Sequence, residues 1–588
     1  MFEKILIANR GEIAIRVAET AHRLGIATVA VFSEQDSDAL HVRCANEKVG
    51  LGGGPAADNY LNIEKIVAAA LESGAQAVHP GYGFLAESAP FAQAVRDAGL
   101  VFIGPSPEAI TAMGEKVAAR AVAVAAQVPL APGSKGPITT ADDVVTFGDA
   151  HGYPVVIKAS YGGGGRGMRE VASAEEAHDA FAAAVREATA AFGNGQVYCE
   201  RYLINARHVE VQIFGDSQGN VVYLADRDCS VQRRHQKLIE EAPAPGLSDD
   251  LRRRMGEAAV RLAREVDYCG AGTVEFLVEG EEFYFLEMNT RIQVEHPVTE
   301  MVTGLDLVEL QLQVASGEPL PIEQGDVRTN GVAIEARINA EDGASGLFLP
   351  SPGPIEELVA PHGDGIRWDA GYERGDEVLP LYDSLIGKLV AWAPTRSVAI
   401  DRLRRALQGL HIVGPSTTAP TERYLLGTDD FREARISTLW LERSVEIPDA
   451  EALEADGDRS QVEVIGRWYR VPLFREGAVA GSPDAPASEV ATVAASRNGR
   501  TGRKSTGKGS SDGRVVSPMQ GTIIKVAVAP GDEVSVGALL FVLEAMKMEN
   551  PIRATQDGVI ASVHVDVGQS MPSGTVLAEF ADLVEGAA

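Results

Sequence analysis

The composition of the chain changes sharply after Phe474, and this change limits what the whole sequence can fold into. Residues 475–512 are mostly Ala, Gly, Ser, Pro and Thr, with almost no large apolar side chains. Such a segment cannot bury enough apolar surface to offset its conformational entropy, so we predict a flexible linker that spans roughly 30–37 Å. A tether of this reach would let a small C-terminal domain travel between separate sites.

Overall composition indicates a globular chain and excludes some classes of function. The 588 residues are 45% hydrophobic and carry a formal net charge of −30, which argues against general nucleic-acid binding. The N-terminus lacks the pattern of a secretory signal, and no apolar stretch is long enough to span a membrane. The four cysteines form no metal or disulfide pattern. We therefore expect a cytoplasmic protein that contacts neither membrane nor nucleic acid.

The C-terminal segment from Val515 contains an internal repeat. Two sets of glycine and apolar residues recur at one offset of 37 residues: Gly521, Gly531, Val534, Gly537 and Leu540, and then Gly558, Gly568, Met571, Gly574 and Leu577. Five matches at a single offset, with alternating apolar residues around them, predict two similar halves. We expect a flattened β-sandwich with quasi-twofold symmetry.

A lysine lies at the junction of these two halves, in the sequence Glu-Ala-Met-Lys-Met-Glu-Asn. Lys547 is expected at an exposed tight turn, behind the mobile linker. Residues 513–582 resemble the biotinyl carrier domain of biotin-dependent carboxylases, which implies that Lys547 carries covalent biotin. The runner-up is a lipoyl domain of the same architecture. Methionine on both sides of the lysine favours biotin, and the Asp that usually precedes a lipoyl lysine is absent.

The N-terminal part alternates strand and helix patterns, which predicts a parallel α/β sheet. A strand at Tyr153–Ser160 is followed by a run of glycines, and the next residues, Met168–Val171, again alternate like a strand. We interpret the run as a flexible loop between two strands whose amides could wrap a triphosphate. The residues proposed for this loop are Gly163, Gly164, Gly165, Arg166 and Gly167. The chain has no Walker A motif.

Two glutamates are predicted to face one another on a hairpin. Apolar runs at Thr273–Val278 and Phe283–Asn289 flank a Glu-Gly-Glu-Glu turn, and Glu275 and Glu287 lie about equally far from it. Two carboxylates amid apolar residues repel each other, and a hard divalent cation such as Mg²⁺ relieves this repulsion. Beyond Glu287, odd positions up to Glu295 are polar, and we expect an extended segment with one polar face for an anionic substrate.

Residues 1 to about 445 resemble the biotin carboxylase domain of the ATP-grasp superfamily. The matching motifs are Ile7–Ala14, His79–Gly83, the glycine loop, Arg207–Glu210, Arg227–Lys237, Glu287–Arg291, Gln293–His296 and Tyr382–Ser384. The implied fold is an α/β N-terminal domain, an ATP-grasp α+β domain and a mixed α/β C-terminal domain, followed by a separate all-β sandwich. We place these at residues 1–115, 116–330, 331–446 and 513–584, with a connecting segment at 447–474 and the linker at 475–512.

The resemblance also implies roles for individual residues. Glu295, Arg337, Lys237 and Arg291 would be catalytic, and Glu275, Glu287 and Asn289 would hold Mg²⁺ or Mn²⁺. Lys237, Arg291, Gln293, Val294 and Glu295 would bind bicarbonate, and Tyr82 and Arg337 would face biotin. ATP would lie among Lys116, Lys158, Glu200, Leu203, His208, Gln232, His235 and Leu277. Glu115, Asn46, Arg201 and the turn Val413–Thr417 depart from the usual family pattern, but none removes a catalytic group.

The implied activity is that of a ligase in acyl-CoA, and hence fatty acid, metabolism. ATP and bicarbonate would form carboxyphosphate, which carboxylates the biotin on Lys547. A separate carboxyltransferase (beta) subunit would then act on acetyl-CoA or propionyl-CoA. A biotin protein ligase would attach the biotin, and the biotin carboxylase domain would self-associate. Two alternatives stay open from the residues: another ATP-grasp ligase with an unrelated C-terminal domain, and a non-catalytic scaffold.

Overall fold

A computed structural model describes residues 1–134, 136–159, 168–192, 195–457, 459–464, 467–472, 514–517, 521–545, 548–571 and 574–581. The chain forms two compact units. The first comprises Met1–Val378 and Leu385–Asp449, and the second comprises Leu379–Ser384 and Ala450–Ala588.

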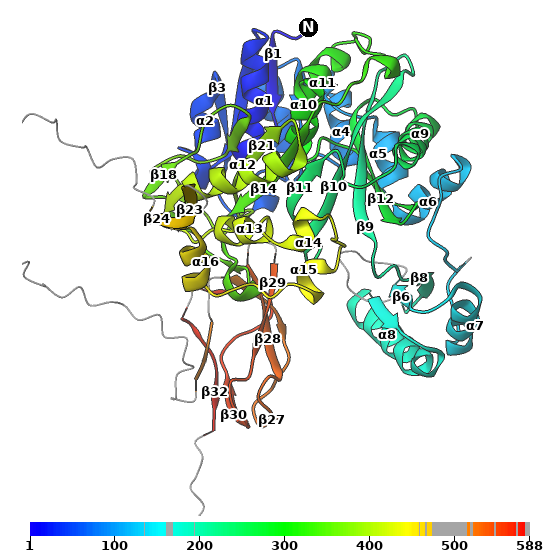
Figure 1. Ribbon diagram of the computed structural model, residues 1–588, viewed down its shortest axis with the longest axis vertical. Helices are drawn as coiled ribbons and strands as arrows, with labels where there is room; N and C mark the ends of the chain where they lie inside the picture. Colours follow the sequence, from blue (N-terminus) through cyan, green and yellow to red (C-terminus); the bar gives the residue numbers. More distant parts are fainter. Residues whose placement is uncertain are drawn as a thin grey trace, which may run out of the picture. The chain divides into compact units, whose positions relative to one another are not determined.

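The first unit begins with a five-stranded parallel sheet of order β3-β2-β1-β4-β5 (Figure 1). The predicted parallel α/β sheet is confirmed, because strands and helices alternate along the chain and the paired strands are parallel. The elements are β1 (Lys4–Ile7), α1 (Gly11–Arg23), β2 (Ala27–Ser33), α2 (Leu40–Cys44), β3 (Glu47–Gly52), α3 (Ile63–Glu72), β4 (Ala77–His79), α4 (Ala89–Asp97), β5 (Val101–Phe102) and α5 (Pro107–Gly114).

An eight-stranded antiparallel sheet of order β13-β12-β9-β10-β11-β14-β21-β19 forms the centre of the unit. The strands are β9 (Arg207–Gly215), β10 (Val221–Arg233), β11 (Gln236–Ala242), β12 (Gly270–Glu279), β13 (Glu282–Asn289), β14 (Val332–Asn339), β19 (Ile366–Ala370) and β21 (Leu385–Ala393). Its helices are α9 (Asp249–Glu265), α10 (His296–Thr303), α11 (Leu307–Ala315), α12 (Arg396–Gly409), α13 (Ala419–Leu425), α14 (Asp429–Arg432) and α15 (Trp440–Arg443). Short strands complete this part: β15 (Glu341–Asp342), β16 (Leu349–Pro350), β17 (Gly353–Pro354), β18 (Glu357–Val359), β20 (Glu377–Val378) and β22 (His411–Val413).

The two faces of this sheet differ in chemistry. On β14, Ile334 and Ile338 pack with Leu403 of α12 in a hydrophobic core, and α9 covers β9 and β12 in the same way. Successive side chains of a strand point to opposite faces, so Glu335 and Arg337 lie on the other face of β14. Helix α10 contacts β10, β11, β14 and β21. The sheet therefore carries a buried polar layer opposite its hydrophobic layer.

A smaller lobe extends the first unit, and Figure 1 shows β6, β8, α7 and α8 projecting from the large sheet. Its sheet has the order β7-β6-β8 and is antiparallel. The two strands predicted around the glycine loop are confirmed as β6 and β7, whereas the loop itself lies outside the described residues. The elements are α7 (Ala141–His151), β6 (Val155–Ala159), β7 (Met168–Val171), α8 (Ala177–Phe192) and β8 (Val197–Arg201). Helix α6 (Lys116–Ala125) precedes them and packs with α9 in the core of the large sheet.

The second unit contains the predicted sandwich. Its two sheets have the orders β25-β32-β30-β27 and β29-β28-β26-β31, around a core that includes Ile523, Leu540 and Leu577. The strands β30, β31 and β32 begin 37 residues after β26, β27 and β28, respectively, so the repeat is confirmed. The elements are β25 (Arg514–Val516), β26 (Gly521–Val526), β27 (Glu533–Val534), β28 (Leu539–Ala545), β29 (Met548–Arg553), β30 (Gly558–Val563), β31 (Ser570–Met571) and β32 (Val576–Phe580).

The connecting segment is more regular than a single strand. It forms a helix, α16 (Ala450–Gly457), and a hairpin of β23 (Arg459–Val464) with β24 (Arg467–Pro472). The sequence predicts one strand-like piece at Val462–Leu473, whereas the structure has two strands here, which pair over six residue positions.

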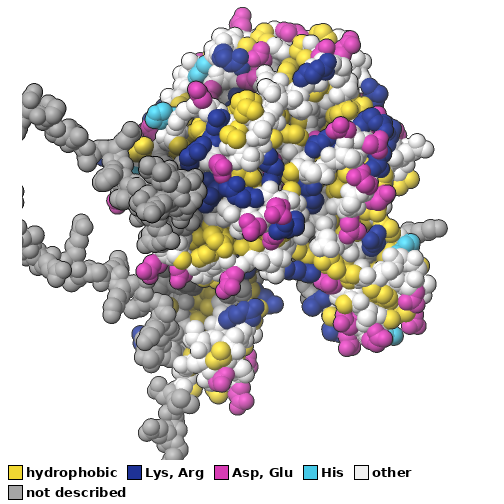
Figure 2. Space-filling model, in the orientation of Figure 1, with side chains coloured by type: hydrophobic (Ala, Val, Ile, Leu, Met, Phe, Trp, Pro, Cys, Tyr) yellow, Lys and Arg dark blue, Asp and Glu magenta, His cyan; other side chains and the backbone are white. Residues whose placement is uncertain are grey.

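Acidic and basic side chains are interspersed on the molecular face shown in Figure 2. On helix α9, Arg253 pairs with Asp250 at 2.6 Å and with Glu257 at 2.9 Å. Such exposed pairs contribute about 0–1 kcal/mol each, so they do little to hold the fold. Among the residues that the structure describes, no helix is both long and apolar enough to cross a membrane.

Candidate active site

Lys237 forms the centre of the buried polar layer. Its Nζ atom lies 2.7 Å from Glu210 Oε2, 3.0 Å from Glu275 Oε1 and 2.6 Å from Glu295 Oε1. The lysine side chain is 12% exposed, and those of the three carboxylates are 0–6% exposed. A single ammonium group is therefore shared by three buried carboxylates that belong to three different elements.

Strand pairing brings two of these carboxylates together. The register of β9 and β12 places Glu210 opposite Glu275 and His208 opposite Leu277. Val209 lies between the polar residues of β9 and packs on the α9 side of the sheet. The alternation of β9 thus aims His208 and Glu210 into one polar layer.

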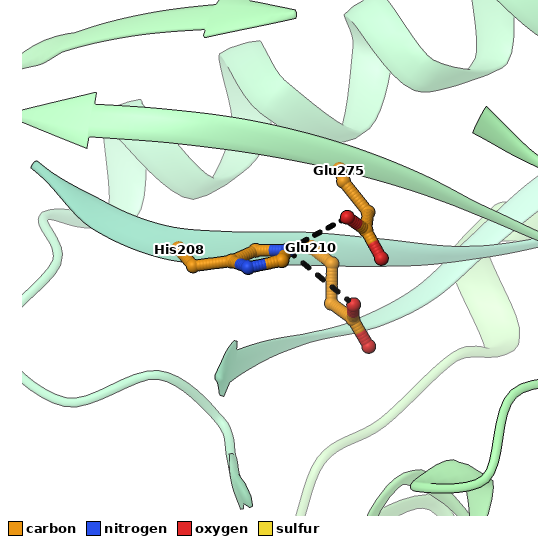
Figure 3. A group of neighbouring side chains, drawn as sticks. All are labelled: His208, Glu210 and Glu275. Atoms are coloured by element: carbon orange, nitrogen blue, oxygen red, sulfur yellow. Dashed lines mark ion pairs between the residues drawn. The ribbon is translucent and has the colours of Figure 1, made fainter. Parts of the chain in front are cut away.

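Figure 3 shows the imidazole of His208 pointing toward the carboxylates of Glu275 and Glu210. His208 Nε2 lies 2.9 Å from Glu275 Oε2 and 3.9 Å from Glu210 Oε2. Burial opposes a charge on the imidazole, but the nearby Glu275 raises the pKa of His208 above its ordinary value. The three side chains have metal-ligating atoms within 4.8 Å of one another, so they could also surround a cation.

Glu295 connects Lys237 to Arg337 at the start of α10. Its backbone precedes the first turn of the helix, and its Oε2 accepts a hydrogen bond of 2.8 Å from Arg337 Nη2. Arg337 Nε also donates to Glu240 Oε1 at 2.5 Å. The structure therefore brings Lys237, Glu295 and Arg337 together, as the resemblance implied, and their catalytic roles stay a prediction.

The cations around Glu295 determine whether its carboxyl group is ionised. Burial alone would favour the neutral acid, but Lys237 and Arg337 hold the pKa of Glu295 well below its ordinary value. Burial likewise opposes the charge of Lys237, whereas the surrounding acidic groups raise its pKa well above the ordinary value. Glu295 is thus ionised near neutral pH, and its two cationic partners limit its affinity for a proton.

The segment that follows β13 corrects one expectation. Residues 290–295 form a bend and a turn rather than an extended strand, because the chain must reverse into α10. The polar side chains still converge through contacts of Arg291. Its Nη2 donates to Asn289 Oδ1 at 2.9 Å, and its Nη1 donates to Gln293 Oε1 at 2.8 Å. The turn, rather than the predicted alternation of side chains along a strand, therefore brings these polar groups together.

The proposed metal ligands lie on one hairpin. Glu275 is opposite Glu287 in the register of β12 and β13, as predicted. Asn289 donates to Glu275 Oε1 at 2.9 Å. Glu275 is buried and Glu287 is exposed. Two carboxylates and an amide oxygen are hard ligands that suit Mg²⁺, so this set fits the ion that the family implies.

The residues proposed for ATP divide between the two sheets. On the small sheet, Lys158 Nζ lies 2.7 Å from Glu200 Oε2. On the large sheet, the register pairs Gln232 with Lys237, next to a tight turn at His235 with φ 65°. Arg201 Nη2, beside Glu200, donates to Glu279 at 3.0 Å and thus connects the two sheets. Leu203 is buried, and the Lys116 side chain and Gly163–Gly167 lie outside the described residues.

Tyr82, proposed to face biotin, belongs to a second buried chain of contacts. Its hydroxyl donates to Glu12, whose other oxygen lies 2.7 Å from Lys388 Nζ. Lys388 also donates to the Val294 carbonyl at 2.8 Å. A chain of polar contacts therefore links Tyr82 to the turn that carries the proposed bicarbonate ligands.

The proposed biotin attachment site, Lys547, lies outside the described residues. The strands on each side of it pair as a hairpin, with Ala545 opposite Met548. A turn at the seam of the repeat, where the sequence places Lys547, agrees with this pairing.

Sequence reasoning missed three members of the site. Glu210 accepts from Lys237, Glu240 accepts from Arg337, and Arg227 donates to Glu210 Oε1 at 2.6 Å. Glu210 could have been found, because polar residues occupy even positions of an otherwise apolar strand from His208 to Gln212. The other two lie in strands that show no comparable pattern.

Comparison with models of protein families finds four matches along the chain. They are the biotin carboxylase N-terminal domain at residues 1–110, the ATP binding domain of the carbamoyl-phosphate synthase L chain at 115–323, the biotin carboxylase C-terminal domain at 335–443 and the biotin-requiring enzyme domain at 513–580. These matches and the buried polar layer define a biotin-dependent carboxylase.

Two relatives that match the chain over nearly its full length show which family of carboxylases it belongs to. The chain is 47% identical over 590 residues to the biotin-dependent acyl-coenzyme A carboxylase alpha3 subunit of Mycobacterium leprae, covering 98% of both chains. It is 40% identical to the propionyl-CoA carboxylase alpha chain of Ruegeria pomeroyi, covering 99% of this chain and 100% of that protein. The chain therefore belongs to the family of biotin-dependent acyl-CoA carboxylase alpha subunits.

Solved structures agree with the fold of the first unit. The biotin carboxylase of Campylobacter jejuni matches with 45% identity and a TM-score of 0.71, over 75% of this chain and 99% of that chain. The biotin carboxylase domain of the 2-oxoglutarate carboxylase of Hydrogenobacter thermophilus matches with 48% identity and a TM-score of 0.70, over 75% and 97%. The predicted fold classes are confirmed. The protein is an ATP-dependent ligase with biotin as its cofactor.

Proposed function

We propose that this chain carboxylates a biotin attached to its own Lys547, with ATP and bicarbonate as substrates. It then passes the carboxyl group to a separate carboxyltransferase subunit that acts on acetyl-CoA or propionyl-CoA. The observation that carries this proposal is the position of the Glu295 carboxylate between Lys237 Nζ at 2.6 Å and Arg337 Nη2 at 2.8 Å. A buried carboxylate between two cations suits proton transfer beside anionic substrates.

Glu295 is the general base in this proposal. It would take the proton of bicarbonate, so that a bicarbonate oxygen can attack the γ-phosphorus of ATP and form carboxyphosphate. Two cations limit the proton affinity of Glu295 in the structure. A bicarbonate anion that draws Lys237 toward itself would weaken the ion pair between Lys237 and Glu295, so substrate binding would raise the proton affinity of the base.

Charge on the phosphates must be neutralised during the attack. ATP would lie between the small sheet and the large sheet. Lys158 of the small sheet and Lys237 of the large sheet would then neutralise charge on its phosphates. Glu275, Glu287 and Asn289 would hold Mg²⁺, which supplies further positive charge to the phosphate oxygens. The Hydrogenobacter structure is a complex with MgADP, ADP and bicarbonate, which supports a nucleotide and bicarbonate as ligands here. The glycine loop would exclude water, since carboxyphosphate hydrolyses.

Arg337 would serve the second half of the reaction. Bound biotin would supply the ureido nitrogen that takes up the CO₂ formed with phosphate from carboxyphosphate, and that phosphate would accept the proton of the ureido nitrogen. Arg337 Nη1 makes no hydrogen bond within the described part of the chain, so it can donate to the ureido oxygen as negative charge develops there.

Two substitutions test the catalytic roles. Glu295→Gln and Arg337→Ala are each expected to lower ATP cleavage in the presence of free biotin and bicarbonate by about 10²–10⁴-fold. Thermal melting of both variants provides the folding control. A variant that melts like the wild type and keeps the wild-type biotin-dependent rate contradicts the role of the residue replaced.

A separate substitution tests the carrier. Lys547→Arg should abolish covalent biotin, detected by a streptavidin blot after expression with a biotin protein ligase, and should leave ATP cleavage with free biotin intact. Lys525→Arg, in the same domain, is the matched control and should remain labelled. Labelling of the Lys547→Arg variant would overturn the attachment site.

The partners and the location belong to the same proposal. Both full-length relatives are alpha subunits of acyl-CoA carboxylases, and the Hydrogenobacter biotin carboxylase domain is a dimer, which supports a carboxyltransferase partner and self-association. Co-purification followed by carboxylation assays with acetyl-CoA, propionyl-CoA and longer acyl-CoA molecules identifies the substrate. A cytoplasmic location, inferred from the sequence, stays a prediction that cell fractionation can test.

A further inference from the structure

Glu240 holds a position that the proposed mechanism leaves without a role. It lies on β11, its side chain is completely buried, and its Oε1 accepts the hydrogen bond from Arg337 Nε at 2.5 Å. Its Oε2 has no hydrogen-bond partner among the described residues. Burying a carboxylate without full hydrogen bonding is unfavourable, so its contact with Arg337 needs an explanation beyond packing.

The two carboxylates on Arg337 differ in what happens to them during the reaction. Glu295 is the proposed base, and it loses its negative charge when it takes a proton from bicarbonate. At that moment its ion pair with Arg337 weakens, although Arg337 is needed directly afterwards at the ureido oxygen. Glu240 takes no part in proton transfer, so it would retain its hold on Nε while the charge of Glu295 changes.

We propose that Glu240 is a positioning residue that fixes the guanidinium plane of Arg337, so that Nη1 stays aimed at the biotin ureido group throughout the reaction. This inference rests on the proposed function, because it assumes that Arg337 contacts biotin. A guanidinium group is planar, and a contact at Nε together with one at Nη2 sets its orientation. Without the contact at Nε, only the contact between Nη2 and Glu295 would hold the guanidinium group, and that contact weakens when Glu295 takes up a proton.

The chain offers a matched control for Glu240. Glu335 on β14 lies directly opposite Glu240 in the strand register and is equally buried. Neither of its oxygens has a hydrogen-bond partner within the described residues. Burial raises the pKa of Glu335 well above its ordinary value. Glutamine at this position keeps the shape of a side chain that makes no hydrogen bond to Arg337. Burial also raises the pKa of Glu240, to about 7, so assays at pH 8 keep that carboxylate ionised.

The test compares the full-length variants Glu240→Gln, Glu335→Gln and Arg337→Ala and the double variant Arg337→Ala/Glu240→Gln. Two rates are measured: bicarbonate-dependent ATP cleavage without biotin, and the kcat and KM for free biotin. Glu240→Gln is expected to lower the biotin-dependent kcat by about 100-fold, while cleavage without biotin changes by less than about threefold. Glu335→Gln should match the wild type in both, and the double variant should be no slower than Arg337→Ala.

Three results would overturn the role of Glu240. They are a wild-type biotin-dependent kcat in Glu240→Gln, an equal loss of both rates, or a double variant whose losses multiply. If Glu240→Gln does not fold, Glu240→Asp keeps the charge at shorter reach and should lower the biotin-dependent kcat by about tenfold; an unchanged kcat there also overturns the role. A wild-type rate in Arg337→Ala would instead show that the proposed function, rather than the positioning role, is wrong.

Discussion

Replacement of Lys237 by methionine tests the charge balance of the buried cluster. Methionine keeps most of the length of the side chain and removes the ammonium group. Lys237 Nζ lies 2.7, 3.0 and 2.6 Å from oxygens of Glu210, Glu275 and Glu295. Without the shared cation, three buried carboxylates repel one another, and we expect one of them to take up a proton.

Proton uptake determines the size of the effect and its pH dependence. An unfolded glutamate has a pKa of about 4.3, so keeping one protonated in the native state at pH 7 costs about 4 kcal/mol. This agrees with the cost of about 3–5 kcal/mol for breaking a buried ion pair. The native variant binds one more proton than its unfolded state. Its loss of unfolding free energy relative to wild type should therefore shrink by about 1.4 kcal/mol per unit as pH falls.

The assay is guanidinium unfolding followed by tryptophan fluorescence, to which the buried Trp440 contributes, at pH 5, 6, 7 and 8. Lys4→Met is the control, because the ion pair of Lys4 with Glu47 is partly exposed at 25% and 48% and should contribute about 0–1 kcal/mol at every pH. A loss below about 1 kcal/mol at pH 7 for Lys237→Met, or equal losses at pH 5 and pH 8, refutes the reasoning.

Two further substitutions test buried contacts of the N-terminal domain. Asp36→Asn should lower the free energy of unfolding by about 3–5 kcal/mol, because Arg10 donates to both oxygens of Asp36, at 2.7 and 2.9 Å. Although burial opposes ionisation, Arg10 lowers the pKa of Asp36. Denaturant titrations should therefore show equal losses at pH 7 and pH 5 and a smaller loss only below about pH 4. Gly81→Ala should cost about 1–3 kcal/mol, because Gly81 has φ +61° and an added Cβ would lie 2.9 Å from Asn9 Nδ2. Gly74→Ala, at φ +68° with open space around it, is the control and should cost about 1 kcal/mol or less in the same titration.

Features set by local periodicity could be predicted from the sequence. The offset of 37 residues predicted two matching sheets, and the hairpin turn predicted Glu275 opposite Glu287. The register of Glu275 and Glu287 follows from the short turn between β12 and β13, whereas the sandwich could be predicted because the same strand pattern occurs twice in the sequence. The resemblance to biotin carboxylases implied one site for Lys237, Glu295 and Arg337, and the structure places the three side chains in contact, while their catalytic roles stay a prediction.

Features set by distant packing could not be predicted in the same way. The polar segment after Asn289 resembles a strand in sequence, but the chain must turn into α10, and tertiary packing overrides the alternation. Glu240 and Arg337 are 97 residues apart in the sequence. No local sequence pattern predicts a contact between residues so far apart. The contact partner of a single glutamate in an apolar strand therefore cannot be predicted until the neighbouring strand is known.

The eight-stranded sheet has a practical consequence for dividing the protein. Its strands β9 to β13 precede residue 330, and β14, β21 and β19 follow it, with β11 paired to β14 along four residue positions. A truncated fragment that ended at residue 330 would leave β11 with a row of unpaired amide and carbonyl groups, which invites aggregation. Expression of the ATP-binding half without its C-terminal neighbour should therefore yield insoluble material rather than an isolated nucleotide-binding module.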